Sequence, residues 1–252
     1  MDFNHILNDR ESGSVTLLNR LIEVLEKDLH GTELKIEDYQ SRLQNLREQL
    51  FHFAAIENFL TSLIRHTGKS KNFSGEALRF IAVYKFYWQG SEYKIAENFL
   101  EQNNPSDRTI FTHSHSETVI SLLKQLHILQ IPFRVLQSLS FPGEEGRLSV
   151  ERMRQLKIKA ELIEDTDIQE ALRKSDIILM GCDALLPTEF LNKVGSRSIL
   201  EEAKKLSRQT ILVTETRKKV NRPEWKNELP EQALFEWVPL SLIDRIVSEK
   251  EN

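Results

Sequence analysis

The residues best suited to chemistry in this sequence lie directly after short apolar runs. The segment Thr112-His113-Ser114-His115-Ser116 follows the run that ends at Phe111. It opens a predicted helix, so its hydroxyls, imidazoles and free backbone N–H groups converge on one point, as at anion sites on helix N-termini. Ser116 by itself would be an ordinary N-cap, with Glu117 in the first helical turn. The five residues together predict an anion site.

Asp183 is the strongest single candidate for acid–base chemistry. It follows the apolar run from Ile177 to Cys182, so its carboxylate is expected at the end of a buried strand. On position alone, a functional carboxylate and a solvated acid that caps the next turn have equal weight. Cys182 lies inside the strand end and is interpreted as a small buried apolar residue rather than a nucleophile.

Further segments carry groups that suit an anion, although each alone would be an ordinary helix start. One is Asn192-Lys193-Val194-Gly195-Ser196-Arg197-Ser198, and another is Glu11-Ser12-Gly13-Ser14 before the first long helix. A basic cluster follows near the C-terminus, comprising Arg217, Lys218, Lys219, Arg222 and Lys226. In a net acidic chain, a cluster without interleaved aromatic residues is typical of a solvated loop rather than a nucleic-acid surface.

Several common sites are excluded by the residue types present. The nine glycines include no pair two or five positions apart, so neither a G-x-G-x-x-G fingerprint nor a P-loop is possible. His113-Ser114-His115 would place two imidazoles on one side of an extended segment. However, a single cysteine and the absence of histidine after His127 leave few further zinc ligands. We therefore expect neither a metal nor another cofactor.

The apolar periodicity predicts which elements position these segments. Up to about residue 102 the spacing is helical, and the pattern predicts helices over Leu18–Leu29, Leu43–Leu63, 75–88 and 92–102. After Pro105, strand-like runs at 109–113, 133–138, 160–164, 176–182 and 210–215 alternate with helical patterns at 117–129, 148–157, 167–174 and 198–208. This alternation predicts an all-helical domain over 1–104 and an open α/β domain with a mostly parallel sheet over 105–252. Ligands of such sheets bind beyond the carboxyl ends of the strands.

Composition narrows the class of protein and its partners. The 252 residues are 40% hydrophobic and 29% charged, with a net charge of -4, which excludes a disordered chain and argues against general binding to nucleic acid. The first ten residues have no apolar signal core, and no uncharged run approaches the roughly 20 residues of a membrane span. We expect a cytoplasmic protein that does not span a membrane.

In combination, these segments resemble one family. The motifs that carry the resemblance are T-I-F-T-H-S-H-S from 109, E-G-R at 145–147, G-C-D at 181–183, N-K-V-G-S at 192–196 and T-E-T-R-K at 214–218. The family comprises the alpha, beta and delta regulatory subunits of the eukaryotic initiation-factor-2B exchange factor, methylthioribose-1-phosphate isomerase and ribose-1,5-bisphosphate isomerase. The resemblance is dense over 109–218 and rests, in the helical half, on S-G-S at 12–14.

The resemblance implies an architecture and a ligand. It implies a helical N-terminal domain, a Rossmann-like C-terminal domain, and a homodimer or higher oligomer assembled through the C-terminal domains. It also implies a pocket for a sugar phosphate or a nucleotide phosphate between the two domains. Asp183 falls where the isomerases keep a catalytic aspartate, and Asn192 and Lys193 fall on their substrate-holding pair.

Two departures from the family pattern bear on catalysis. Ser114 occupies the position of the isomerase cysteine, and the segment Gln137–Pro142 lacks the arginine that anchors phosphate there. A thiol with a pKa of about 8.5 can move a proton near neutral pH, whereas a serine hydroxyl needs a strong base beside it. His113 or His115 could serve as that base.

The main prediction is therefore an initiation-factor-2B-like protein that binds a phosphorylated sugar or nucleotide and acts in regulation and assembly. The alternative is an aldose–ketose sugar-1-phosphate isomerase that uses Asp183 with His113 or His115, and a third possibility is an oligomeric scaffold with a vestigial pocket. The predicted catalytic positions are Asp183, Ser114 and His113. The predicted ligand-binding residues are Ser14, Thr112, His115, Ser116, Arg147, Asn192, Lys193, Gly195, Ser196 and Lys218.

Overall fold

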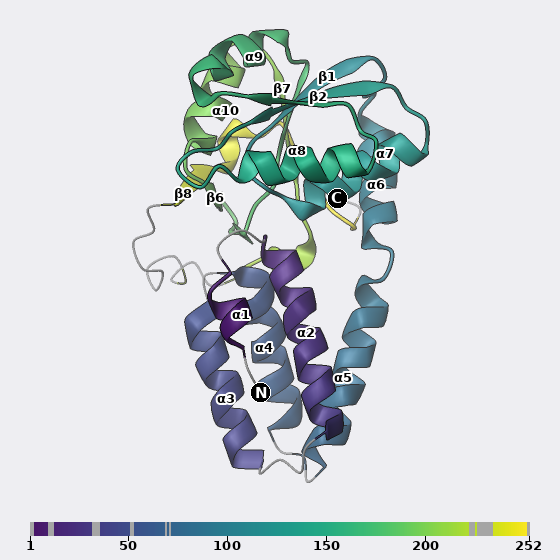
Figure 1. Cartoon of the computed structure of the whole chain (residues 1–252), viewed down its shortest axis with the longest axis vertical. Coiled ribbons are helices and arrows are strands. Elements are labelled where there is room, and N and C mark those ends of the chain that lie inside the picture. Colours follow the sequence, from purple (N-terminus) through teal and green to yellow (C-terminus); the bar gives the residue numbers. More distant parts are fainter. Residues whose placement is uncertain are drawn as a thin grey trace. The chain divides into compact units, whose positions relative to one another are not determined.

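The computed structural model describes residues 3–9, 13–31, 36–50, 53–68, 70, 72–221, 225 and 234–250. The chain divides into two compact units, Met1–Gly90 and Ser91–Asn252, and each is described by itself. The predicted architecture, a helical N-terminal region followed by a Rossmann-like region with a mostly parallel sheet, is confirmed (Figure 1). No helix among the described residues has the length and apolar character needed to cross a membrane.

The first unit is helical. It contains α1 (Asn4–Leu7), α2 (Ser14–Gly31), α3 (Ile36–Leu50), α4 (Ala54–Thr67) and α5 (Phe73–Trp88). The apolar stripe of α2 is fully buried against α4 and α5, as its spacing predicted.

The prediction of one long helix over Leu43–Leu63 is wrong. The structure has two helices here, because α3 ends at Leu50 and α4 begins at Ala54, after Phe53 in an extended conformation. The two helices pack against each other, so their apolar stripes face one shared core. The three-to-four-residue apolar spacing continues across the connection, and the connection contains no glycine or proline. The sequence pattern therefore gives no sign that the first helix ends there.

The second unit is an α/β unit with two sheets. Its helices are α6 (Ser91–Gln102), α7 (Glu117–Ile128), α8 (Glu145–Gln155), α9 (Ile168–Lys174) and α10 (Ser196–Lys205). Its strands are β1 (Arg108–Thr112), β2 (Phe133–Ser138), β3 (Ala160–Ile163), β4 (Ile177–Met180), β5 (Ala184–Leu185), β6 (Glu189–Lys193), β7 (Gln209–Val213), β8 (Phe235–Pro239) and β9 (Arg245–Val247). The main sheet is parallel throughout, in the order β3-β2-β1-β4-β7-β9.

Strand side chains alternate between two apolar cores, one on each face of the main sheet. Ile177 and Leu179 of β4 pack in the core that α7 and α8 cover, whereas Ile178 and Met180 pack in the core that α9 and α10 cover. This is the period-two alternation of a strand buried on both faces. The strand order turns around between β1 and β4, and this is where doubly wound sheets leave a crevice at their carboxyl edge.

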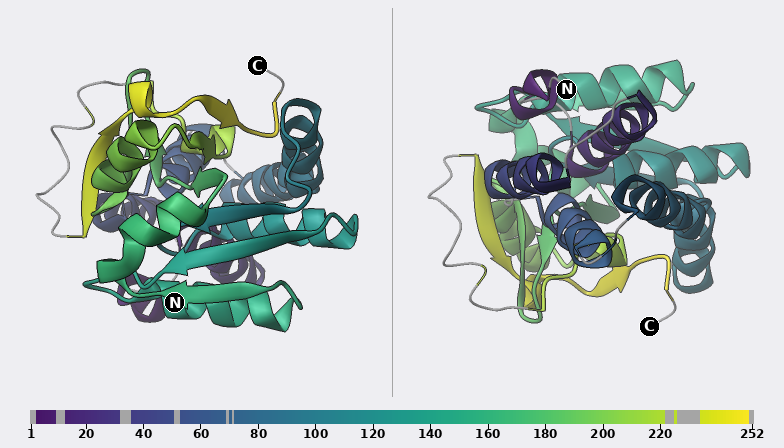
Figure 2. Two further views of the ribbon diagram at one scale, coloured as in Figure 1. Left: turned by 90° about the horizontal axis from the view of Figure 1, so that it is seen from above. Right: turned by 90° about the horizontal axis from the view of Figure 1, so that it is seen from below.

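A second, antiparallel sheet of β5, β6 and β8 was not predicted. Its strand β8 lies beside α10, in yellow at the margin of the molecule (Figure 2). Asn192 and Lys193 are predicted at a helix start, but they end β6, and α10 begins only at Ser196. β6 gains its strand conformation from pairing with β8, which lies far along the chain, so its local pattern is weak.

The two compact units divide after Gly90, whereas the domain assignment from the sequence placed all helices up to Asn104 in the first domain. The physical reason is α6. Its residues Ile95 and Phe99 pack in the same core as α7 and the sheet, and Asn98 Nδ2 donates to the carbonyl oxygen of Ser248 at 2.8 Å. The change of periodicity near Pro105 thus marks the first strand rather than the division between the two units.

Candidate functional site

His113 lies at the centre of a buried hydrogen-bonded chain at the carboxyl end of β1. Its ring is buried, and Nε2 lies 3.0 Å from the carbonyl oxygen of Val194. A carbonyl oxygen only accepts, so Nε2 carries the proton, and Nδ1 accepts from the hydroxyl of Ser138 at 2.7 Å. Burial lowers the pKa of His113 below its usual 6.5. The imidazole is therefore neutral at pH 7, and both ring nitrogens are engaged.

The chain continues from His113 to the backbone of Ser114. The hydroxyl oxygens of Ser138 and Ser140 are 2.9 Å apart, and the N–H of Ser114 donates to the Ser140 hydroxyl at 2.7 Å. Ser114 itself has a positive φ of 63°, and its carbonyl oxygen accepts from Gln137 Nε2 at 3.0 Å. These hydrogen bonds hold the loop after β1 against the end of β2.

His115 differs from His113 because its acceptor nitrogen makes no hydrogen bond to a described residue. Ser149 donates its hydroxyl hydrogen to the carbonyl oxygen of Ser114 at 3.2 Å, so its oxygen accepts from Nδ1–H of His115 at 2.9 Å. Nε2 of the neutral ring then carries no hydrogen, and it lies 3.9 Å from a carboxylate oxygen of Glu117. Burial lowers the pKa of His115 as well.

The flanking residues of this segment have structural contacts. Thr112 is the last residue of β1 and is buried in register between Gln137 of β2 and Leu179 of β4. Ser116 is the N-cap of α7, and its hydroxyl accepts from the N–H of Val119 at 3.4 Å.

The turn between β6 and α10 brings a buried lysine to the same edge of the sheet. Lys193 Nζ lies 2.7 Å from Glu145 Oε1, and the two side chains are only 2% and 14% exposed. Asn192 Nδ2 donates to the Ser196 hydroxyl at 2.9 Å, and this hydroxyl donates to the carbonyl oxygen of Lys193 at 2.6 Å. Gly195 has a φ of 98°, and a side chain there would meet the His113 ring at 3.3 Å. This turn is therefore held against His113.

Asp183 stands at the carboxyl end of β4, as predicted, and is half-buried. Lys218 is buried beside it and donates from Nζ to the carbonyl oxygen of Cys182 at 2.7 Å and to the hydroxyl of Thr118 at 3.3 Å. Lys218 thus holds the backbone of Cys182, the residue before Asp183, in place. Burial raises the pKa of the Cys182 thiol to about 11, so the thiol stays protonated at neutral pH and is a poor nucleophile.

Other predicted residues belong to none of these clusters. Arg147 is exposed on α8 and pairs with Glu144 at 2.8 Å. Ser14 is buried at the start of α2 and belongs to the first unit. The positions Glu11, Ser12, Arg222 and Lys226 lie outside the described residues. Within the described ranges, no three histidine, cysteine, aspartate or glutamate residues are grouped as metal ligands would be.

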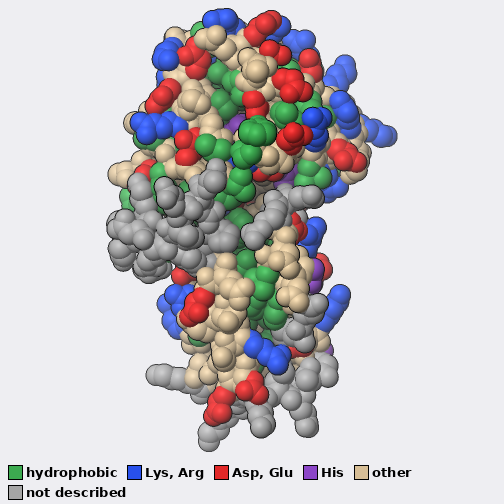
Figure 3. All heavy atoms as spheres, turned by 60° about the vertical axis from the view of Figure 1, so that its left-hand side comes forward, with side chains coloured by type: hydrophobic (Ala, Val, Ile, Leu, Met, Phe, Trp, Pro, Cys, Tyr) green, Lys and Arg blue, Asp and Glu red, His purple; other side chains and the backbone are tan. Residues whose placement is uncertain are grey.

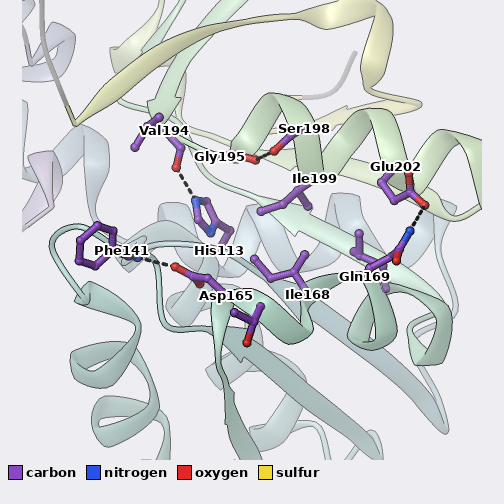
Figure 4. A pocket seen from close by; sticks show the side chains of 12 residues that line it. His113, Phe141, Asp165, Ile168, Gln169, Val194, Gly195, Ser198, Ile199 and Glu202 are labelled. Carbon is purple, nitrogen blue, oxygen red and sulfur yellow. Dashed lines mark hydrogen bonds between the residues drawn. The ribbon is translucent and has the colours of Figure 1, made fainter.

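A pocket of about 360 Å³ opens beside His113, between α9 and α10 (Figure 4). Ile168 and Ile199 form apolar walls, and Asp165 accepts hydrogen bonds from the N–H groups of Ser140 and Phe141 at 2.9 and 2.7 Å. Its described lining includes two carboxylates and neither lysine nor arginine. This pocket therefore does not favour an anion, and the two buried lysines at the carboxyl edge of the sheet, Lys193 and Lys218, are not among its lining residues.

Charges on the surface of the α/β unit are mixed. Figure 3 shows lysine and arginine side chains interspersed with aspartate and glutamate over this unit, rather than gathered in one patch. The face in view therefore presents no single-sign field of the kind that attracts nucleic acid.

The residues of the site that the sequence did not predict are mainly polar groups at the end of β2 and just after it. Gln137, Ser138 and Ser140 were interpreted only as the loss of a phosphate-anchoring arginine. All three are buried, and they hold the loop after β1. A run of polar residues at the end of a strand that is otherwise apolar was the signal available, since buried polar groups need partners.

Comparisons with known proteins bear on the family and the fold of the chain. A family model described as "Initiation factor 2 subunit family" matches residues 10–236. The chain is 24% identical over 166 residues to a ribose 1,5-bisphosphate isomerase from Archaeoglobus fulgidus, a match that spans 65% of this chain but only 53% of that relative.

Two solved structures share the fold. One is the tetrameric eIF2B-beta2-delta2 complex from C. thermophilum, with a TM-score of 0.77 and 17% identity over 98% of this chain and 89% of that chain. The other is 5-methylthioribose 1-phosphate isomerase from Pyrococcus horikoshii OT3, with a TM-score of 0.75 and 14% identity over 97% and 81%.

Proposed function

Because this chain belongs to the initiation factor 2 subunit family, we propose that it binds a phosphorylated sugar or nucleotide and acts in regulation and assembly rather than in turnover. The observation that carries the proposal is the buried ammonium group of Lys193, at the carboxyl edge of the sheet and just before the N-terminus of α10. The bond to Glu145 uses one of the three N–H donors of Lys193, and a phosphate oxygen beside the helix N-terminus is an acceptor that suits the remaining donors.

The surroundings of Ser114 support binding over catalysis. A serine at this position needs a base, and the adjacent His113 has Nδ1 bonded to Ser138 and Nε2 bonded to Val194. In this arrangement His113 holds the loop and the β6–α10 turn in place. It is a positioning residue in the proposed function.

An aldose–ketose isomerase is the second candidate. The match to a ribose 1,5-bisphosphate isomerase favours it, as does Asp183 at the end of β4. In that function His115 would be the base, because its Nε2 is the ring nitrogen left as an acceptor. The chain matches about half of the length of that relative, so the relative's activity does not transfer to it without a direct test.

Replacement of Lys193 tests the binding proposal. Lys193→Ala is expected to weaken binding of ribose 1,5-bisphosphate, 5-methylthioribose 1-phosphate or a nucleoside monophosphate by about tenfold or more, because one charge-assisted hydrogen bond contributes roughly 1.5–3 kcal/mol. Isothermal titration calorimetry measures the change in Kd. The matched control is Lys205→Ala, which removes an exposed lysine of α10. An unchanged Kd for a ligand that the wild type binds would contradict the placement at Lys193.

Assembly is the second part of the proposal. We expect a homodimer or larger oligomer formed through the α/β unit, so light scattering after size exclusion should give at least twice the mass of one chain. Phe141, which is 67% exposed in this unit, is the residue to disrupt, and Phe141→Asp should lower the mass. Phe86→Asp is the matched control in the helical unit, where Phe86 is 79% exposed. A monomeric wild type, or a loss of mass only in Phe86→Asp, would contradict this interface.

A further inference from the structure

A second cavity, of about 780 Å³, lies at the amino edge of the main sheet. Its lining comes from the amino-terminal parts of β1, β2 and β3, from the ends of α8 and α9, and from the connection between α8 and β3. Because the sheet is parallel throughout, this edge is opposite the one that carries His113 and Asp183. Thr109 in the lining precedes His113 by four residues of extended chain, which is about 13 Å. The cavity is therefore separate from the candidate site described above.

Basic side chains dominate the charged groups of this cavity. The charged lining residues are four basic ones and one acidic one, namely Arg134, Arg154, Lys159, Lys174 and Glu161. The lining thus has a net charge of +3, in a chain whose total is -4. Lys174 is paired with Glu170 at 2.6 Å, but the other three basic residues form no ion pair within the part of the chain that the structure describes. The cavity therefore gathers cationic groups that lack an ionic partner.

Helix ends account for only half of these basic residues. Lysine and arginine commonly lie in the last turn of a helix, where they offset its negative carbonyl end. Arg154 lies in the last turn of α8, and Lys174 ends α9. Arg134 lies in β2, and Lys159 directly precedes β3, so neither offsets a helix end. A ligand with negative groups would account for both.

A hydrogen bond holds the guanidinium group of Arg134 at the sheet. Arg134 and Thr109 are paired in register on β2 and β1, and Nη2 of Arg134 donates to the buried Thr109 hydroxyl at 3.2 Å. A guanidinium group has five N–H donors in a planar fork, so the remaining donors suit a carboxylate or a phosphate. The nearby carboxylate of Asp176 accepts from the N–H of Thr109 at 2.9 Å and is paired with Arg108 at 3.1 Å. Its charge is therefore already compensated.

The size and the apolar part of the cavity indicate the class of ligand. A volume of about 780 Å³ is typical of small-molecule sites and is much larger than a single anionic group needs. Leu136 and Ile158 add apolar surface beside the charges, which suits a carbon skeleton. We propose that this cavity is a second binding site, for a small organic molecule with at least two carboxylate or phosphate groups. The inference goes beyond the proposed function and does not rest on it.

The experiment is isothermal titration calorimetry on the full-length chain with two matched pairs of anions. The first pair is citrate and acetate, and the second is tripolyphosphate and inorganic phosphate. We expect the polyanion of at least one pair to bind about tenfold or more tightly than its single-group counterpart, because it adds at least one charge-assisted hydrogen bond. The pair with the larger ratio shows whether the site takes carboxylates or phosphates.

Variants of the lining connect this binding to the cavity. Arg134→Gln is expected to weaken binding of the polyanion by about tenfold. The double variant Arg154→Gln/Lys159→Gln should do the same, and both of its positions are exposed, so its fold does not depend on the bond to Thr109. Glu161→Gln should instead tighten binding by about two- to fivefold, because it removes a repelling carboxylate from an exposed position. Thermal melting checks that each variant is folded.

Two matched controls remove a positive charge elsewhere. Arg79→Gln changes an exposed arginine of α5, and Lys205→Gln changes an exposed lysine of α10. Neither residue lines the cavity, so both variants should bind the polyanion as the wild type does.

Three results would overturn the inference. One is equal affinity for both members of each pair. Another is weakening of the same size in the controls as in the cavity variants, since the polyanion would then be attracted to basic side chains in general. The third is binding of poly-glutamate without binding of either small polyanion, which would favour an acidic protein partner over a small molecule.

Discussion

The wild-type chain is expected to convert neither ribose 1,5-bisphosphate nor 5-methylthioribose 1-phosphate at a measurable rate. Ser114 stands at the position where the isomerases that this chain resembles have a cysteine thiol. Both ring nitrogens of the adjacent His113 are hydrogen-bonded, one to Ser138 and the other to Val194. A positioned acid–base group supplies about 10²–10⁴ in rate, so the loss of one should be plain even where the ligand binds. Asp183 alone is not expected to compensate for this loss.

Proton NMR of each sugar phosphate, mixed with an equal amount of protein, measures any conversion to product directly. The variant Asp183→Asn, which lacks the predicted catalytic carboxylate, is the negative control. Turnover in the wild type that disappears in Asp183→Asn would contradict the prediction and would favour the isomerase candidate. In that case His115→Gln should abolish the activity as well, since His115 keeps the acceptor nitrogen.

Stability toward urea is expected to fall as the pH drops below about 6.5. Burial lowers the pKa of both His113 and His115, so between pH 6.5 and the folded-state pKa the unfolded chain binds more protons than the folded chain. The free energy of unfolding rises with pH wherever the unfolded state binds more protons. The contribution is therefore complete above about pH 6.5 and is lost as the pH falls. Each histidine contributes a slope of up to about 1.4 kcal/mol per pH unit.

Urea unfolding at intervals from pH 5.0 to 7.5 measures the slope. His113→Asn should reduce it by about half, whereas His127→Asn, at an exposed position of α7, should leave it unchanged. The pKa of Asp176, lowered chiefly by the N–H of Thr109, affects stability only below about pH 4, outside this range. A flat profile in the wild type would show that neither buried imidazole resists protonation.

The parallel sheet could be predicted because its strands carry their own signal. β4 consists of four buried apolar residues, Ile177–Met180, and no other element fits so short a run next to a turn. β5 has only two residues, and β6 pairs with β8, which begins at Phe235, so the small sheet has no local signature. The family resemblance drawn from the motifs is confirmed, and its order of motifs matches the order of the strand ends.

Within the site, the sequence located the motifs but not the direction of every side chain. The motif at 145–147 suggested Arg147 as an anion ligand, yet Glu145 is the residue that reaches Lys193. The two are separated by two positions on α8, a rotation of about 200° around the helix axis, so they point to opposite sides. Which side faces inward is decided by the close packing of Gly146 on the end of β2, and this is a tertiary contact.

The His113 ring joins parts of the chain that are made at very different times during synthesis. Its partners Ser138 and Val194 lie 25 and 81 positions further along. A nascent chain that has emerged only as far as α9 already contains the imidazole and the serine, but it lacks the carbonyl that fixes the tautomer. Contacts of such long sequence separation carry a loop-closure cost that slows folding. A ribosome-bound chain therefore cannot complete the hydrogen bonds of His113 until Val194 has been synthesised.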